Sequence, residues 1–257
     1  MIESLFVPGI IVPSVVALVA GVFAVTVARW LRWATYRKPD EESMPLPGSR
    51  WWVVPTLATL AWVLSWRALF APPAQLTGAV VDPGSSAGVP SLTQFVVLAT
   101  LLVVGLSCVC LAAMDMDVHR LPDRIMWPTM GILIVGLALA AAVGGHWWPL
   151  ARMLICAVGA GAFYLTLSLV SLARGSLALG LGDVKLSVVL GGGLGWFGFQ
   201  SVVVGLYAGF LVGGVAAALM LVTKKVGFDG HLAYGPPMMV GAMVGLLLPP
   251  DILSSMF

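Results

Sequence analysis

Two short acidic stretches adjoin apolar runs in this chain, and their aspartates could do chemistry. Asp183 lies in Gly180-Leu181-Gly182-Asp183-Val184-Lys185, and Asp115 and Asp117 follow a long apolar run. A carboxylate beside such sequence is costly and needs a reason. Two carboxylates that meet in a low-dielectric site share a proton, so one can act as base and the other as acid. Such a pair could activate water to attack a peptide carbonyl and then protonate the leaving nitrogen.

The composition indicates a membrane protein that crosses the bilayer several times. Apolar residues make up 60% of the 257 residues and charged residues only 9%, against about 25% charged residues in an ordinary soluble domain. The net charge of +2 and the absence of a long basic cluster argue against a nucleic-acid partner. The first apolar run lacks the basic flank of a cleavable signal, so we expect a retained span with its N-terminus outside.

No cofactor or metal site is expected from the cysteines and histidines. Cys108, Cys110 and Cys156 all lie in apolar runs and form no CxxC pair, which favours buried small hydrophobes over thiolate ligands. The three histidines are scattered, and a metal site needs several ligands together. They are His119, expected in a solvated loop, His146 on the outer face, and His231 in a loop before the last span.

We predict an all-α fold, a polytopic membrane bundle of about eight transmembrane helices. A span needs roughly 20 apolar residues. The predicted spans are about 10–31, 51–69, 92–114, 125–143, 150–172, 186–199, 202–222 and 236–248. Glycines recur at every fourth position in the last three spans, which favours close helix packing. The alternative is a flexible C-terminal half that parts to admit a substrate helix.

Alternating spans place eleven of the 13 basic residues on one side of the membrane, all but Arg67 and Arg152. By the positive-inside rule this side is cytoplasmic, and both chain ends lie outside. Arg152 is expected to snorkel at the outer interface. Tryptophans gather at the predicted span ends and are interpreted as interface belts. We therefore expect membrane lipid to surround the predicted spans.

The two aspartate stretches are expected to meet at the cytoplasmic edge. Asp115 ends the third span and Asp183 opens the sixth, and the two spans between them return the chain to the same face. Gly180 and Gly182 would let backbone approach an extended substrate and would allow an unwound conformation. Asp117 is either solvated or supports the site, and Asp123 fits a helix cap.

Lys185 has two open interpretations. It could contact a substrate carbonyl or keep Asp183 ionised, or it could simply anchor the chain on the positive side of the membrane.

The two stretches together resemble the type IV prepilin peptidase family of membrane aspartic proteases. Asp115 stands seven residues before Pro122-Asp123, as the first catalytic aspartate does in that family. Gly180, Gly182, Asp183 and Lys185 match its Gly-x-Gly-Asp-x-Lys motif, and residues 233–237 are similar to the stretch that opens its last span. The resemblance covers about residues 93–249. It implies a six-helix peptidase core at 93–257, preceded by a two-helix region at 1–92.

The resemblance implies an aspartic endopeptidase that uses Asp115 and Asp183 to remove the leader of a prepilin or pseudopilin. Cleavage would occur at the cytoplasmic face of the inner membrane, without a cofactor. Bifunctional members carry a longer cytoplasmic loop with two CxxC pairs that bind zinc, whereas residues 33–50 contain no cysteine. N-methylation of the mature pilin is therefore not supported, and the oligomeric state stays open.

Two other classes compete with a peptidase. An inactive membrane protein of pilus or secretion assembly would need neither aspartate. An ion-coupled transporter would be expected to carry a carboxylate near mid-membrane, and no predicted span interior contains Asp or Glu.

Overall fold

The structure is a computed structural model that describes residues 3–41, 47–70, 91–173, 180–222 and 233–247. These residues form helices and connecting turns, with no strand among them. The helices are α1 (Glu3–Arg32), η1 (Pro39–Glu41), α2 (Val53–Leu69), α3 (Leu92–Val118), α4 (Asp123–Gly144), α5 (Trp148–Ala173), α6 (Leu181–Phe197), α7 (Phe199–Val222) and α8 (Gly235–Leu247). The predicted all-α bundle is confirmed. Arg174, Lys224, Lys225 and His231 lie outside the described residues.

The chain is a multi-pass membrane protein. Five of the described helices are long and apolar enough to cross a bilayer: α1 from Ile10, α3, α4, α5 and α7. Many large apolar side chains on these helices are exposed, as expected of surfaces that face lipid. The shorter α2, α6 and α8 complete the predicted set of eight, and their crossing of the membrane stays a prediction.

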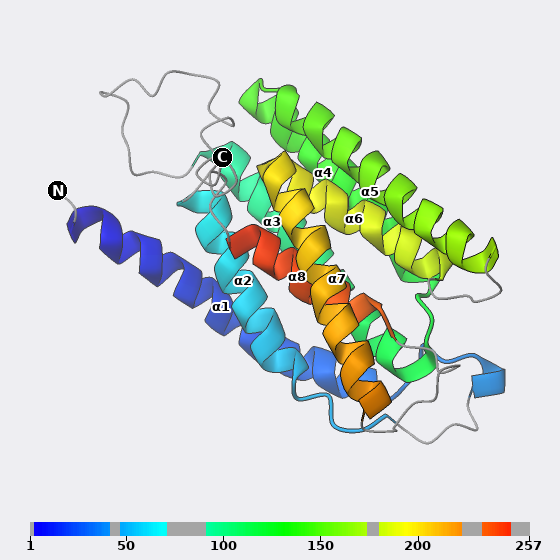
Figure 1. The fold of residues 1–257 in the computed structure, drawn as a ribbon. Helices are drawn as coiled ribbons and strands as arrows, with labels where there is room; N and C mark the ends of the chain where they lie inside the picture. Colours follow the sequence, from blue (N-terminus) through cyan, green and yellow to red (C-terminus); the bar gives the residue numbers. More distant parts are fainter. Residues whose placement is uncertain (1–2, 42–46, 71–90, 174–179, 223–232, 248–257) are drawn as a thin grey trace.

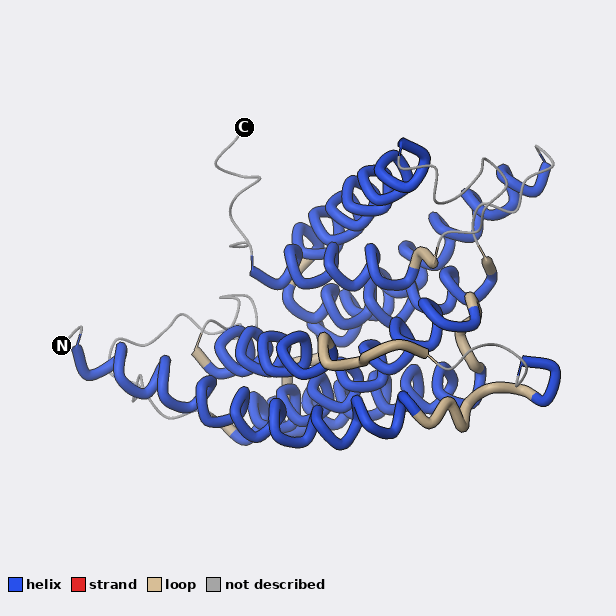
Figure 2. Tube along the Cα trace, turned by 90° about the horizontal axis from the view of Figure 1, so that it is seen from below, coloured by secondary structure: helices blue, strands red, loops and turns tan. Residues whose placement is uncertain are grey.

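The helices pack as neighbouring pairs around α3, α6 and α8. Figure 1 shows α1 and α2 on one side of the bundle and α4, α5 and α6 on the other, with α3 and α8 between them. One buried apolar cluster contains side chains of α1, α2 and α3. A larger cluster contains side chains of every helix from α2 through α8. Viewed from below, the described chain consists of long helices joined by short loops (Figure 2). Of these helices, α8 contacts both α3 and α6.

Two helix boundaries differ from the predicted spans and matter for the acidic stretches. α3 continues to Val118, so Asp115 and Asp117 lie in its last turns. α6 begins at Leu181, so Gly182 and Asp183 lie in its first turn and the expected unwound segment is absent there. The start is fixed because the Gly180 N–H donates to Asp183 Oδ2 at 3.2 Å, which satisfies one of the donors that a helix N-terminus leaves open.

The glycine rows let helices approach at backbone distance, which confirms the packing interpretation. A Cβ placed on Gly241 of α8 would lie 2.3 Å from Gly209 N and 2.4 Å from Gly205 O, both on α7. A Cβ on Gly195 of α6 would lie 2.5 Å from Cys156 Cβ on α5. Parting of these helices around a substrate remains a hypothesis.

The expectation that Arg152 snorkels is wrong. Its side chain is 1% exposed, and Nε donates to the Gly195 carbonyl at 2.7 Å while Nη2 donates to the Trp196 carbonyl. The last carbonyls of a helix have no partner within the helix. The Arg152 guanidinium donates to two of these carbonyls at the end of α6, which accounts for its burial there instead of at the membrane interface. Arg67 is also buried, with its guanidinium 5.5 Å from the centre of the Phe197 ring.

The structure agrees with the predicted burial of the cysteines and with the exposure expected of most interface tryptophans. Cys108, Cys110 and Cys156 are free and buried, as expected. Trp33, Trp51, Trp127, Trp147 and Trp148 are exposed, whereas Trp196 lies in the core.

Gly241→Ala should loosen the α7–α8 pair. Alanine favours a helix by about 1 kcal/mol over glycine, yet overpacking against rigid backbone costs about 1–3 kcal/mol. We expect a lower melting temperature in detergent. The matched control is Gly214→Ala in α7, where an added Cβ meets nothing within 4 Å. A control that loses as much stability as Gly241→Ala would contradict the packing assignment.

Candidate active site

Asp115 is held by the N-terminus of another helix. Its side chain is 5% exposed, and Oδ2 accepts a hydrogen bond from the Gly235 N–H at 3.0 Å. Gly235 begins α8, and the free N–H groups of a helix start favour a carboxylate. A Cβ at position 235 would lie only 2.9 Å from Oδ2. A side chain at position 235 would therefore displace the Asp115 carboxyl group by a few tenths of an ångström.

Asp183 has a similar arrangement at the start of its own helix. The side chain is 9% exposed, and Oδ2 accepts from the Gly180 N–H. Burial raises the pKa of the Asp183 carboxyl group, and the nearby Asp115 charge adds to this rise. The action of the two aspartates as a pair stays a prediction.

Two tyrosines adjoin Asp183, and the sequence analysis did not select them. Tyr164 of α5 is fully buried, and its ring centre lies 6.4 Å from that of Tyr234, the residue before α8. Burial raises the pKa of Tyr234 to about 12, and the Asp183 charge adds to this rise. Tyr234 is therefore a neutral hydroxyl at any physiological pH. The sequence signal that could have indicated Tyr234 is its position within residues 233–237, the stretch that is similar to the start of the last span in the family.

Gly182 faces Leu121, the residue before Pro122 in the connection between α3 and α4. Pro122 is the N-cap of α4. A Cβ on Gly182 would lie 3.1 Å from Leu121 Cδ1, so a side chain of the protein itself uses the space that this glycine leaves. Approach of a substrate backbone at Gly182 stays a prediction.

Lys185 and Asp123 tie α6 to α4. Lys185 Nζ lies 2.5 Å from Asp123 Oδ1 and 5.4 Å from the centre of the Trp127 ring. The structure thus pairs Lys185 with Asp123, while contact of Lys185 with a substrate carbonyl and its anchoring of the chain at the membrane both stay predictions. The predicted cap role of Asp123 is wrong, because Pro122, whose φ is fixed by its ring, takes the N-cap position. Asp123 instead lies in the first turn, where a carboxylate suits the helix dipole.

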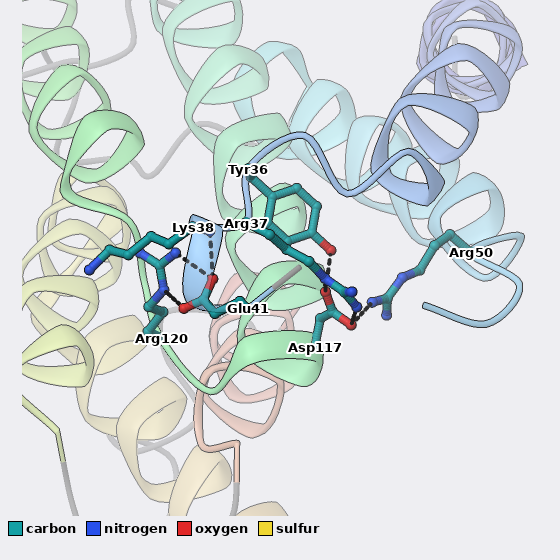
Figure 3. Close-up of polar contacts among 7 residues, drawn as sticks. All are labelled: Tyr36, Arg37, Lys38, Glu41, Arg50, Asp117 and Arg120. Carbon is teal, nitrogen blue, oxygen red and sulfur yellow. Dashed lines mark hydrogen bonds and ion pairs between the residues drawn. The ribbon is translucent and has the colours of Figure 1, made fainter. Parts of the chain in front are cut away.

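Asp117 is buried by cations from the segment between α1 and α2, which excludes the solvated interpretation. Arg37 donates from Nε to Oδ2 at 3.0 Å and from Nη2 to Oδ1 at 2.9 Å. The Tyr36 hydroxyl donates to Oδ2 at 2.7 Å, and Arg50 Nη2 lies 3.6 Å from Oδ1. Figure 3 shows these groups converging on one carboxylate. Burial, with the nearby Asp117 charge, raises the pKa of Tyr36 to about 12.

An apolar cavity of about 370 Å³ lies alongside Asp115, between α2, α3, α6 and α8. Ala112 and Met116, one turn before and just after Asp115, line it together with Pro236, which follows Gly235. Leu101, Phe197 and Leu246 line it farther along the same helices. Eleven residues of α3 separate Leu101 from Ala112, a rise of about 16 Å. The cavity therefore extends from the level of Asp115 on α3 into the apolar interior of the bundle.

Among the residues that the structure describes, no three histidine, cysteine or acidic side chains come together in a group that could hold a metal ion.

Comparison with known proteins identifies the segment that carries both aspartates. Residues 102–218 match the profile of the Type IV leader peptidase family. This segment of the chain is therefore similar to that family. The type IV leader peptidase match includes Asp115 and Asp183, whereas Tyr234 and Gly235 follow it in the sequence.

Curated relatives carry the name prepilin leader peptidase/N-methyltransferase. The chain is 30% identical to the protein of Neisseria gonorrhoeae over 137 residues, which cover 53% of this chain and 44% of the relative. It is 34% identical to that of Burkholderia pseudomallei over 155 residues (58% and 46%). It is 35% identical to that of Dickeya chrysanthemi over 156 residues (59% and 50%). The chain thus spans about half the length of these relatives. No solved structure matches it significantly.

Asp115→Asn and Asp117→Ala should differ in their effect on stability. Asparagine at 115 keeps an oxygen for the Gly235 N–H and removes a buried charge, so we expect a change below about 1 kcal/mol. Alanine at 117 leaves Arg37 and Arg50 without their carboxylate, which costs about 3 kcal/mol for a buried pair. Thermal unfolding in one detergent compares the two. Equal melting temperatures would contradict the assignment of Asp117 to a structural ion pair.

Proposed function

We propose that this protein is a membrane aspartic endopeptidase that removes the leader peptide of type IV prepilins or pseudopilins. The observation that carries the proposal is the pair of buried carboxyl groups, Asp115 and Asp183, on two helices of the family segment. Each lies within the electrostatic range of the other, and each has one oxygen bound by a backbone N–H. Such an arrangement suits a proton-sharing dyad.

The reaction follows from this arrangement. One carboxylate takes a proton from water, and the resulting nucleophile attacks the scissile carbonyl carbon. The other carboxyl group donates its proton to the carbonyl oxygen, and a proton then passes to the departing nitrogen as the C–N bond breaks. The Gly235 and Gly180 N–H groups orient the two carboxyl planes throughout. They lie on helix starts and need no rearrangement for catalysis, which is the basis of electrostatic preorganisation.

The apolar cavity supports a substrate whose cleavage site adjoins an apolar helix. A basic leader would remain in water among phospholipid headgroups, while the following helix would lie against α3 and α8 beside the dyad. The names of the relatives point to the same substrate class.

We propose that cleavage occurs at the cytoplasmic face of the inner membrane. Arg37, Arg50 and Arg120 lie at the end of α3 that carries Asp115, and basic residues favour the cytoplasmic side. N-methylation is not part of the proposal, because residues 33–50 offer no cysteine for a zinc site.

Asp115→Asn and Asp183→Asn should each abolish leader removal from a co-expressed prepilin, a loss of at least about a thousandfold, because either change removes half of the acid–base pair. Immunoblotting for leader removal and for protein level measures both. Asp117→Asn, the matched control two residues away, should be milder.

Cleavage at the parental rate by either dyad variant would overturn the residue assignment. A wild-type protein that cleaves no prepilin or pseudopilin from its own genome would instead favour an assembly protein without peptidase activity.

Gly235→Ala should lower the turnover rate with little effect on folding. The new methyl group would push Asp115 away by several tenths of an ångström, and a misplacement near 1 Å can cost about a hundredfold in rate. We expect a loss of about tenfold to a hundredfold. Gly131→Ala in α4, where an added Cβ meets nothing within 4 Å, is the control. Unchanged turnover in Gly235→Ala would contradict a catalytic position for Asp115.

A further inference from the structure

The segment that follows α1 crosses the end of α3 and forms two ion pairs with it. In one ion pair the segment supplies the cation, and in the other it supplies the anion. The segment supplies a cation, Arg37, to Asp117, and an anion, Glu41, to Arg120. Arg120 donates from Nε to Glu41 Oε1 at 2.6 Å and from Nη2 to Oε2 at 2.7 Å. Both contacts are two-pronged, and Figure 3 shows them side by side. We call Arg37, Glu41, Asp117 and Arg120 the clamp.

The clamp is stronger than an ordinary surface ion pair. The side chains of Arg37 and Asp117 are only 4% and 8% exposed, and two-pronged guanidinium–carboxylate pairs fix geometry as well as charge. Hydrogen bonding by Arg120 lowers the pKa of Glu41 to about 2, so Glu41 stays ionised at any physiological pH.

The clamp encloses both strained turns of the described chain. Among the described residues, Ala34 and His119 are the two non-glycine residues with positive φ, at 51° and 49°. A left-handed conformation is costly for such residues and persists only where surrounding contacts impose it. Ala34 precedes Arg37 by three residues, and His119 lies between Asp117 and Arg120. Both turns therefore lie within three residues of a clamp residue.

The His119 turn is bonded directly to the backbone of Asp115. The His119 N–H donates to the Asp115 carbonyl at 3.0 Å and ends α3. A shift of Asp117 and Arg120 would release this turn, and the last turn of α3 with it. A movement of the clamp would therefore also move the Asp115 carboxyl group, because one helical turn connects them.

We propose that Arg37, Glu41 and Arg120 are positioning residues for Asp115, an inference that rests on the proposed function. The clamp holds the end of α3 so that the Asp115 carboxyl group meets the Gly235 N–H and faces Asp183. The segment between α1 and α2 thereby contributes to catalysis without touching substrate.

A charge exchange tests the proposal. Glu41→Arg and Arg120→Glu should each lower kcat for a prepilin substrate about tenfold, with KM within about twofold, since positioning affects the reacting geometry. The double variant restores a two-pronged pair, and we expect kcat at least about fivefold above either single variant. Recovery stays incomplete because the guanidinium introduced at position 41 would lie near that of Arg37. Arg29→Glu, an equal charge change at an exposed site, should keep the wild-type kcat.

A second measurement does not depend on catalysis. In an Asp115→Cys background, labelling by a water-soluble maleimide should be slow, since position 115 is buried and the native cysteines are buried too. Adding Glu41→Arg should speed labelling about tenfold, and the charge exchange should slow it again.

A double variant no better than either single variant, in kcat and in labelling, would overturn the clamp. Single variants that lower only the melting temperature, with kcat unchanged, would also overturn it. Absence of cleavage by the wild-type protein would refute the proposed function, while labelling would still decide whether the clamp positions residue 115.

Discussion

A carboxyl group buried among apolar helices has to find hydrogen-bond donors, and the arrangement of this protein follows from that requirement. A buried ion without partners costs several kcal/mol, whereas a hydrogen bond to a charged group returns about 1.5–3 kcal/mol. Asp115 and Asp183 each receive a backbone N–H at the start of a helix. Such donors are available without a side chain, so they need little space. The pair is therefore possible only if α8 starts beside the end of α3, and if α6 starts beside both.

Small residues make this meeting of helix ends possible. Gly241 brings α8 to backbone distance from α7, and Gly195 does the same for α6 and α5. Gly235 contributes at the site itself, because a Cβ there would lie only 2.9 Å from Asp115 Oδ2 and would displace the carboxyl group. In a bilayer, where lipid is as apolar as leucine, close packing of this kind is a main source of helix association. Gly241 and Gly195 thus affect the site indirectly, through helix packing, whereas Gly235 acts directly beside Asp115.

Spacing and apolar pattern were sufficient to predict the helices and their order, and to place Asp115 near the end of α3 and Asp183 near the start of α6. Contacts between distant segments were not predictable in this way. The sequence could not show that Arg152 serves the carbonyls of α6, because that depends on how α5 packs. Nor could it show that Asp117 is enclosed by Arg37 and Arg50, which are about 70–80 positions away. Asp123 was misjudged by one position, since a proline before it is equally able to begin a helix.

The two ends of α6 have one further consequence, for movement. At its start Asp183 accepts the Gly180 N–H, and at its end the Arg152 guanidinium covers the Gly195 and Trp196 carbonyls. Each end thus carries the charge that opposes the helix dipole there, and neither end can unwind without exposing a buried ion. A movement of α6 that changes the separation of the two carboxyl groups would then displace this helix as a rigid rod. Because Arg152 lies on α5, its guanidinium would tie such a movement of α6 to the neighbouring helix.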